Sequence, residues 1–286
     1  MFKQIVHSWM FGPMDLGRIL EDLAAAGADG IDLSASFDES HNNLSVLSGA
    51  RAGSLLAGSG LPVEVITPLY RSKHLDFSHP DESIRKTTIE FTNGCVDLAR
   101  LYGAKRVLVS ASRIGPAHQI HSSYEEDWKR ATDSLSRSAG YAEKQGVKLM
   151  LEPINRYMVG LVHTVAEARR MINEIGSPAI CIVPDAFHMN IEEENGVLGG
   201  IFSAKGDIGC LHLGNNNRRP PSAGAIDWIA ILRALKETGF DGPLSHEPVE
   251  LYFSENKMAS DYKYREKFIS GLAESIVYLR RCMKQL

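Results

Sequence analysis

Short apolar runs of strand length alternate along the chain with segments in which apolar residues recur at helical spacing. The runs are KQIVHSW, GIDLS, PVEVITP, KRVLVS, VKLMLE, AICIVPD, IGCLHLG and PLSHEP. Helical spacing is clearest in two sets, Leu16, Ile19, Leu20 and Leu23, and Trp228, Ile231, Leu232 and Leu235. The pattern therefore predicts eight strands that alternate with eight helices, each helix having one apolar face toward a sheet.

Signals for the ends of helices support the predicted alternation of strands and helices. Thr164 followed by Glu167 is a capping-box signal for the start of the fifth helix, and a glycine in ETGFDG marks the end of the seventh. This rhythm predicts an α/β fold, a (β/α)8 TIM barrel, as a single catalytic domain over residues 1–286. The alternative, an open doubly wound sheet, calls for a glycine-rich phosphate turn after the first strand, and SWMFGPMDLG does not supply one.

Composition narrows the classes of partner. The chain has 286 residues, of which 44% are hydrophobic, and a net charge of −4, so electrostatic tracking of nucleic acid is not expected. The four cysteines lie far apart without a C-x-x-C pair, which favours reduced, packed thiols. Neither a leader peptide nor a run of 18 apolar residues is evident, so we expect a cytoplasmic protein without a membrane partner.

Four polar residues fall at the ends of consecutive predicted strands. Glu152, Asp185, His212 and Glu247 are separated by 33, 27 and 35 residues, close to the roughly 31 residues of an average β/α unit. Chemistry in such barrels takes place at the carboxyl ends of the strands. We therefore expect these side chains to converge at one end of the barrel.

Three carboxylates and an imidazole at one site would repel one another or shift their pKa values unless a cation neutralised them. Oxygen ligands with one nitrogen suit a hard divalent ion, so we expect one Mn²⁺, with Mg²⁺ or Co²⁺ as alternatives. Taken singly, each residue is better explained as structural, for example as a salt-bridged strand-end acid. Their common spacing on adjacent strands is what favours a metal site.

Other polar residues give weaker signals. His7, in the first strand, either lines the mouth of the barrel or packs in the core. One member of the Arg218–Arg219 pair, in the loop after HLGNNN, is a candidate ligand for an anionic or carbonyl oxygen. The segment HQIHSSYEED, residues 118–127, predicts a solvated loop and a helix start.

Several motifs resemble those of a known group of barrels. LEPINRY, PDAFHMNIEE, HLGNNNR and SHEP are similar to motifs of the sugar phosphate isomerase/epimerase superfamily, the xylose isomerase-like barrels. Within it, the chain resembles ketose 3-epimerases, keto-acid sugar epimerases and hydroxypyruvate isomerases. The resemblance implies metal ligation by Glu152, Asp185, His212 and Glu247, and substrate contacts by His188 and Arg218. In ketose 3-epimerases a second glutamate stands six residues after the first, where this chain has Met158.

The resemblance implies a metal-dependent epimerase or isomerase of a keto-sugar. The metal would stabilise an enediolate, with Glu152 and Glu247 as the catalytic acid and base. Because Met158 replaces a sugar-binding acid, we expect free ketohexoses to be poor substrates. Sugars with a carboxylate, paired with Arg218 or Arg219, or with an apolar group, packed on Met158, should react faster.

Alternatives remain open. The large subunit of a C-glycoside deglycosidase, a lyase that eliminates the aglycone from a 3-oxo-glycoside, would use the same metal frame. A nuclease of the AP-endonuclease type would need more zinc ligands and a basic face, and an inactive sugar-binding paralogue would not need the ligand set.

We expect a small-molecule sugar partner and a homo-oligomer, dimer or tetramer, joined by a small second subunit under the lyase alternative.

Overall fold

The computed structural model describes residues 1–115, 120–249 and 255–286. Within these ranges each predicted strand is present: β1 (Gln4–His7), β2 (Gly30–Ala35), β3 (Val63–Pro68), β4 (Arg106–Val109), β5 (Lys148–Leu151), β6 (Ile180–Ile182), β7 (Leu211–Leu213) and β8 (Leu244–His246). All are short, as expected of strands whose side chains fill a barrel interior.

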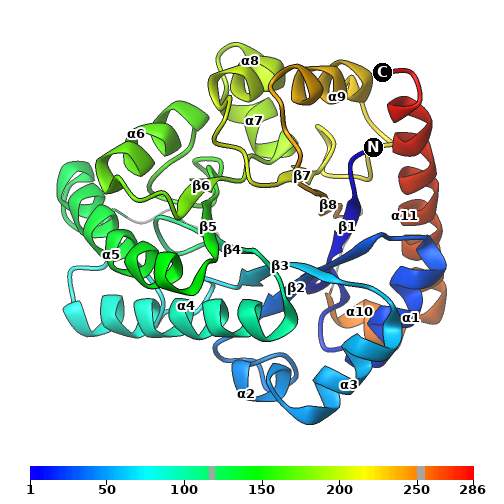
Figure 1. Cartoon of the computed structure of the whole chain (residues 1–286), viewed down its shortest axis with the longest axis horizontal. Coiled ribbons are helices and arrows are strands. Elements are labelled where there is room, and N and C mark those ends of the chain that lie inside the picture. Colours follow the sequence, from blue (N-terminus) through cyan, green and yellow to red (C-terminus); the bar gives the residue numbers. More distant parts are fainter. Residues whose placement is uncertain (116–119, 250–254) are drawn as a thin grey trace.

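The strands form one parallel sheet in the order β6-β5-β4-β3-β2-β1-β8-β7. Residues after β6 pair with β7 through the isolated bridge Asp185↔His212, and Ile182 pairs with Ile208 just before β7. These bridges join the two ends of the sheet, with helices around the outside (Figure 1). The predicted (β/α)8 barrel is therefore confirmed.

The longer helices form the outer ring of the barrel (Figure 1): α1 (Leu16–Ala26), α3 (Ala50–Ser59), α4 (Glu82–Tyr102), α5 (Tyr124–Gln145), α6 (Val165–Ile175), α9 (Trp228–Glu237) and α11 (Tyr262–Met283). The helix predicted between β6 and β7 is present as two short helices, α7 (Ala186–Glu192) and α8 (Gly196–Ser203), whereas the 3₁₀ helix η1 (Ser8–Phe11), α2 (Leu44–Leu47) and α10 (Glu255–Ser260) were not predicted. Most of them lie in the loops that follow a strand, so they shape the active end of the barrel.

Local sequence explains where the outer helices begin and end. The Thr164 hydroxyl accepts a hydrogen bond from Glu167 N, and the Glu167 carboxylate accepts one from Thr164 N, which is the predicted capping box. After α9, Gly239 has φ of 76°, a left-handed conformation in which glycine carries no Cβ penalty. Both predicted helix boundaries are confirmed.

The β4–α5 connection differs from its prediction in one respect. Helix α5 begins at Tyr124, with Ser123 as its cap, as expected. His121, expected in a solvated loop, instead lies with Nε2 2.9 Å from Asp76 Oδ2, and its side chain is mostly buried. His118 lies outside the described residues.

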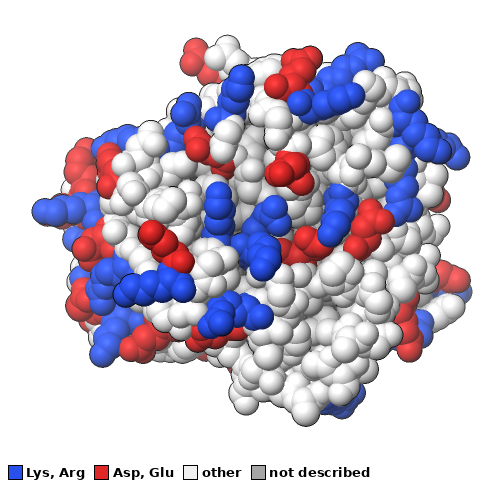
Figure 2. Space-filling model, viewed as in Figure 1, with Lys and Arg blue, Asp and Glu red and all other residues white. Residues whose placement is uncertain are grey.

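Surface and core agree with the composition. Basic and acidic side chains are interspersed on the face shown in Figure 2, without a large area of one sign. All four cysteines, Cys95, Cys181, Cys210 and Cys282, are buried and free. Within the described part of the chain, every helix is too short or too polar to span a bilayer.

Candidate metal centre and active site

The four predicted ligands are positioned by the ladders of the barrel. Glu152 directly follows β5 and its N–H donates to Val109 O at 3.0 Å, while Glu247 directly follows β8 and its N–H donates to Leu213 O at 3.3 Å. Asp185 follows β6 and caps α7 by accepting from Phe187 N at 2.8 Å. Because the backbone of each residue is held by neighbouring elements, the side chains are fixed in direction.

These side chains converge. One ligand atom from each of Glu152, Asp185, His212 and Glu247 lies within 4.8 Å of all the others, and all four residues are buried. His212 Nδ1 is 3.0 Å from Glu152 Oε1 and 3.5 Å from Glu247 Oε2. We refer to this set as the charged base. The structure therefore brings together the four residues that strand spacing singled out.

Burial and mutual repulsion perturb the protonation of the charged base. Burial raises the pKa of Asp185 to about 7 and also raises the pKa of Glu152. Burial alone would lower the pKa of His212, but the adjacent carboxylates of Glu152 and Glu247 hold it well above its ordinary value. Burial would raise the pKa of Glu247, but Arg218 and His212 hold it well below its ordinary value. The site thus gathers positive charge around its carboxyl groups.

A divalent cation fits this donor set. Three carboxylates and one imidazole, buried and within coordination reach of a common point, match the oxygen-rich ligand sets of Mn²⁺ and Mg²⁺. His212 directs Nδ1 toward the carboxylates, and its other ring nitrogen, Nε2, has no hydrogen-bond partner among the described residues. An imidazole with one nitrogen aimed at the acids is suited to metal ligation through that nitrogen.

Asp32 lies behind the histidine. Its Oδ2 is 3.9 Å from His212 Nε2, and its carboxyl group accepts hydrogen bonds from Thr67 Oγ1 at 2.7 Å and Ser245 Oγ at 2.9 Å. A carboxyl group behind a ligating histidine fixes the ring orientation in many metal sites. Sequence analysis missed Asp32, although an acid inside the apolar run GIDLS was a visible signal.

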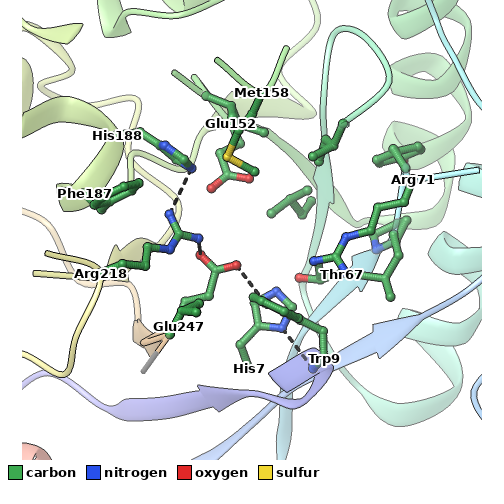
Figure 3. A pocket seen from close by; sticks show the side chains of 17 residues that line it. His7, Trp9, Thr67, Arg71, Glu152, Met158, Phe187, His188, Arg218 and Glu247 are labelled. Carbon is green, nitrogen blue, oxygen red and sulfur yellow. Dashed lines mark hydrogen bonds and ion pairs between the residues drawn. The ribbon is translucent and has the colours of Figure 1, made fainter. Parts of the chain in front are cut away.

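A cavity of about 280 Å³ opens over the charged base. The predicted substrate contacts His7, Met158, His188 and Arg218 all line it, together with Glu152 and Glu247 (Figure 3). Of the Arg218–Arg219 pair, it is Arg218 that borders the cavity.

Arg218 is held at the edge of the charged base. Its backbone has φ of 62°, uncommon for a residue with a Cβ. Its guanidinium donates to Asp185 Oδ2 at 3.0 Å and to Glu247 Oε2 at 2.9 Å. His188 joins this group, with Nε2 3.2 Å from Arg218 Nη1 and Nδ1 2.7 Å from Asn155 Nδ2. Arg218 therefore pairs with two acids of the charged base, and the role expected for it toward a substrate carboxylate stays a prediction.

Two further cavity residues were not predicted. Trp9 Nε1 donates to Glu247 Oε1 at 2.7 Å, and the Arg71 guanidinium lies 4.5 Å from the centre of the Trp9 ring. Both residues come from segments that follow a strand, η1 after β1 and the loop after β3. Both residues lie close to the end of a predicted strand, which was the available signal for a place at the cavity. No regular spacing distinguished them from their neighbours.

Comparison with known proteins agrees with this geometry. The family model described as the xylose isomerase-like TIM barrel matches residues 20–268. An L-ribulose 3-epimerase of Mesorhizobium japonicum is 36% identical over 172 residues, 60% of this chain and 57% of that protein. A D-psicose 3-epimerase of Ruminiclostridium cellulolyticum is 30% identical over 242 residues, 82% of this chain and 78% of that protein.

A solved structure of an L-ribulose 3-epimerase is also similar to this chain. It matches with a TM-score of 0.83 and 27% identity, covering 100% of this chain and 95% of that one. Fold, site geometry and sequence similarity lead to one conclusion: the chain belongs to the xylose isomerase-like TIM barrel family of the sugar phosphate isomerase/epimerase superfamily, and its relatives are ketose 3-epimerases.

Proposed function

We propose that the protein is a divalent-metal-dependent epimerase or isomerase of a keto-sugar, with Mn²⁺ as the ion. The observation that carries this proposal is the convergence of Glu152, Asp185, His212 and Glu247 within 4.8 Å at the base of a cavity. The names of the relatives, L-ribulose 3-epimerase and D-psicose 3-epimerase, support the same class of substrate. The buried, free thiols support a reducing compartment such as the cytoplasm.

A divalent ion held by the four residues would supply Lewis acidity, which makes the proton on the carbon next to a sugar carbonyl easier to remove. Glu152 and Glu247 face each other across the cavity (Figure 3). One carboxylate takes the proton from one face of the sugar, and the other returns a proton to the opposite face. Return to the same carbon inverts its configuration, and return to the neighbouring carbon gives the isomer.

Other side chains orient the reacting groups. Arg218 and His188 border the cavity next to Glu247 and Asp185, where N–H groups can donate to sugar oxygens. Trp9 holds Glu247 through its indole N–H, which fixes the direction of that carboxylate. Both glutamates are largely buried, which limits their contact with bulk water while they exchange protons with the sugar.

The test is proton exchange in deuterated water. The Mn²⁺-loaded protein is incubated with a panel of ketoses, ketoses with a carboxylate, and 3-oxo-glycosides, and products are read by NMR and mass spectrometry. Deuterium in a returned or epimerised sugar is the expected result. Aglycone release from a 3-oxo-glycoside without epimerisation would favour the lyase alternative, and no exchange with any keto-sugar would overturn the proposal.

A further inference from the structure

One side of the cavity is made of apolar side chains. Leu108 of β4, Ile114 of the following loop, and Ile154 and Met158 of the loop after β5 all line the cavity. We refer to these residues as the apolar wall. Met158 points into the cavity on the side of Glu152, across from Glu247 and Trp9 (Figure 3). A substrate whose reacting carbons lie on the charged base would extend its far end toward this wall.

Two polar side chains near the wall, both in the part of the chain that the structure describes, are hydrogen-bonded within the protein. Tyr70 also lines the cavity, but its hydroxyl is hydrogen-bonded to Thr92 Oγ1 at 2.8 Å, and the side chain is almost fully buried. Asn155, between the two wall residues of the β5 loop, has its amide Nδ2 2.7 Å from His188 Nδ1. Neither group is directed at a ligand on the wall.

Backbone groups of the wall are also paired. Ile114 N donates to Tyr70 O at 2.8 Å, and Gly115 N donates to Met158 O at 3.0 Å. The second bond ties the β4 loop to the β5 loop, so the wall is a connected surface rather than two separate loops. A sugar hydroxyl buried against it would lose hydrogen bonds to water without gaining equivalent ones.

Arg71 is the competing feature, because a guanidinium in a cavity can bind an anion. Its guanidinium, however, is held on the Trp9 side of the cavity. It stacks on Trp9 at 4.5 Å, and Trp9 in turn donates to Glu247 of the charged base. In Figure 3, Arg71 and Met158 approach the cavity from different directions. The wall itself therefore offers methyl, methylene and thioether groups.

We propose that the substrate is a deoxy-keto-sugar, whose carbon chain ends in a methyl or similarly small apolar group that packs on Leu108, Ile114, Ile154 and Met158. This inference rests on the proposed function, because it places the reacting carbonyl on the charged base. The cavity volume of about 280 Å³ is just below the range for small-molecule sites, roughly 300–1,000 Å³. A small terminal group fits this space better than a large aglycone.

Three probes that differ only at carbon 6 test the proposal: D-fructose, 6-deoxy-D-fructose and D-fructuronate, with their L-enantiomers in parallel. Deuterium uptake next to the carbonyl gives kcat/KM for each, and the melting shift of the Mn²⁺-loaded protein gives binding independently of turnover. Apolar pockets reject an added hydroxyl only by up to about 10²-fold. We expect the deoxy-sugar to be preferred over the hydroxymethyl sugar by roughly 10- to 100-fold.

Two variants of Met158 make the test specific to the wall. Met158→Gln keeps the length of the side chain and adds hydrogen-bonding groups, so the preference for the deoxy-sugar should fall by about 10-fold. Met158→Leu keeps the wall apolar and should retain the preference.

Equal rates with the methyl and hydroxymethyl sugars, or a preference for the carboxylate, would overturn this inference and leave the proposed function standing. The carboxylate result would direct attention to Arg71. Deuterium uptake from none of these probes would overturn this inference, and the proposed function would fall with it only if no keto-sugar of the wider panel exchanged either.

Discussion

The charged base and the apolar wall of the same cavity are built in different ways. Residues of the charged base stand on or directly after β5, β7 and β8, or cap the helix after β6, and their backbones are held in hydrogen bonds between strands. The apolar wall takes Leu108 from a strand, but its other members lie in loops. Under the proposed function, the chemistry that needs fixed distances would lie on the rigid frame, and selectivity would lie in loops whose sequence can vary without disturbing that frame.

The largest expected effect comes from replacing Glu152 and Glu247, the acid and base of the proposed mechanism. Glu152→Gln and Glu247→Gln each keep the shape of the side chain, but the amide cannot take up or release a proton as the carboxyl group does. Turnover should therefore fall by at least roughly 10²-fold. Steady-state rates on the best keto-sugar measure this, with melting curves as a check on folding. Glu125→Gln, in the exposed first turn of α5, is the matched control and should keep full activity. Near-normal turnover in either active-site variant would contradict the two-carboxylate scheme.

Removing the metal should lower stability. At a free concentration of about 100 times its Kd, an ion that binds only the folded protein stabilises the fold by about 2.7 kcal/mol. Chelation of the ion abolishes this stabilisation. Thermal melting with EDTA and with added Mn²⁺ measures the change, and metal analysis should give about one ion per chain. Asp185→Asn should show a smaller Mn²⁺ shift. If the unaltered protein held no bound ion and showed no melting shift, the charged base would not be a metal centre.

Asp32 should influence the metal without touching it. Asp32→Asn removes the charge behind His212 Nε2 while keeping the side-chain volume, and loss of such a partner costs about 10- to 100-fold in metal affinity. Calorimetric titration with Mn²⁺ gives this number without an activity assay. Thr67→Val, which removes one hydrogen bond to Asp32, should cost less. An unchanged Kd in Asp32→Asn would mean that His212 is oriented by other contacts.

His246 sets a pH dependence of stability on the barrel frame itself. Burial lowers its pKa from 6.5 to about 3, and Nε2 is 2.9 Å from Gln4 Oε1. The unfolded chain therefore binds a proton below pH 6.5 that the folded chain does not. Stability from this group is complete above pH 6.5 and decreases by about 1.4 kcal/mol per pH unit as the pH falls from 6.5 toward 3.

The matching measurement compares the free energy of unfolding at pH 7 and pH 5 in the unaltered protein and in His246→Asn. The variant can still donate a hydrogen bond to Gln4, so it should show a smaller loss on acidification. The same slope in both proteins would show that His246 does not cause the acid sensitivity.

The barrel and the convergence of the charged base could both be predicted from the sequence, for the same physical reason. Parallel strands end at one edge, so Glu152, Asp185, His212 and Glu247 at single-unit spacing had to come close. Asp32 was missed because one acid in an apolar run looks the same whether it faces the interior of the barrel or its surroundings. The eight strands could be predicted equally well from the sequence, since each is a short apolar run with clear boundaries.

The loops were harder to predict. Met158 was identified as a cavity residue, but Trp9 and Arg71 were not, because their positions depend on the path of η1 and of the loop after β3. The pairing of Arg218 with two acids of the charged base was not predicted, for a similar reason. Its left-handed backbone turns the guanidinium toward Asp185 and Glu247, and no periodic pattern encodes that turn.

The metal centre is the claim on which the rest depends, and anomalous diffraction tests it directly. Crystals grown with Mn²⁺ are measured on both sides of the manganese absorption edge. We predict one anomalous peak per chain, bounded by Glu152, Asp185, His212 and Glu247, with His212 bound through Nδ1. A map with no peak among these four residues, or with its main peak elsewhere in the chain, would contradict the account.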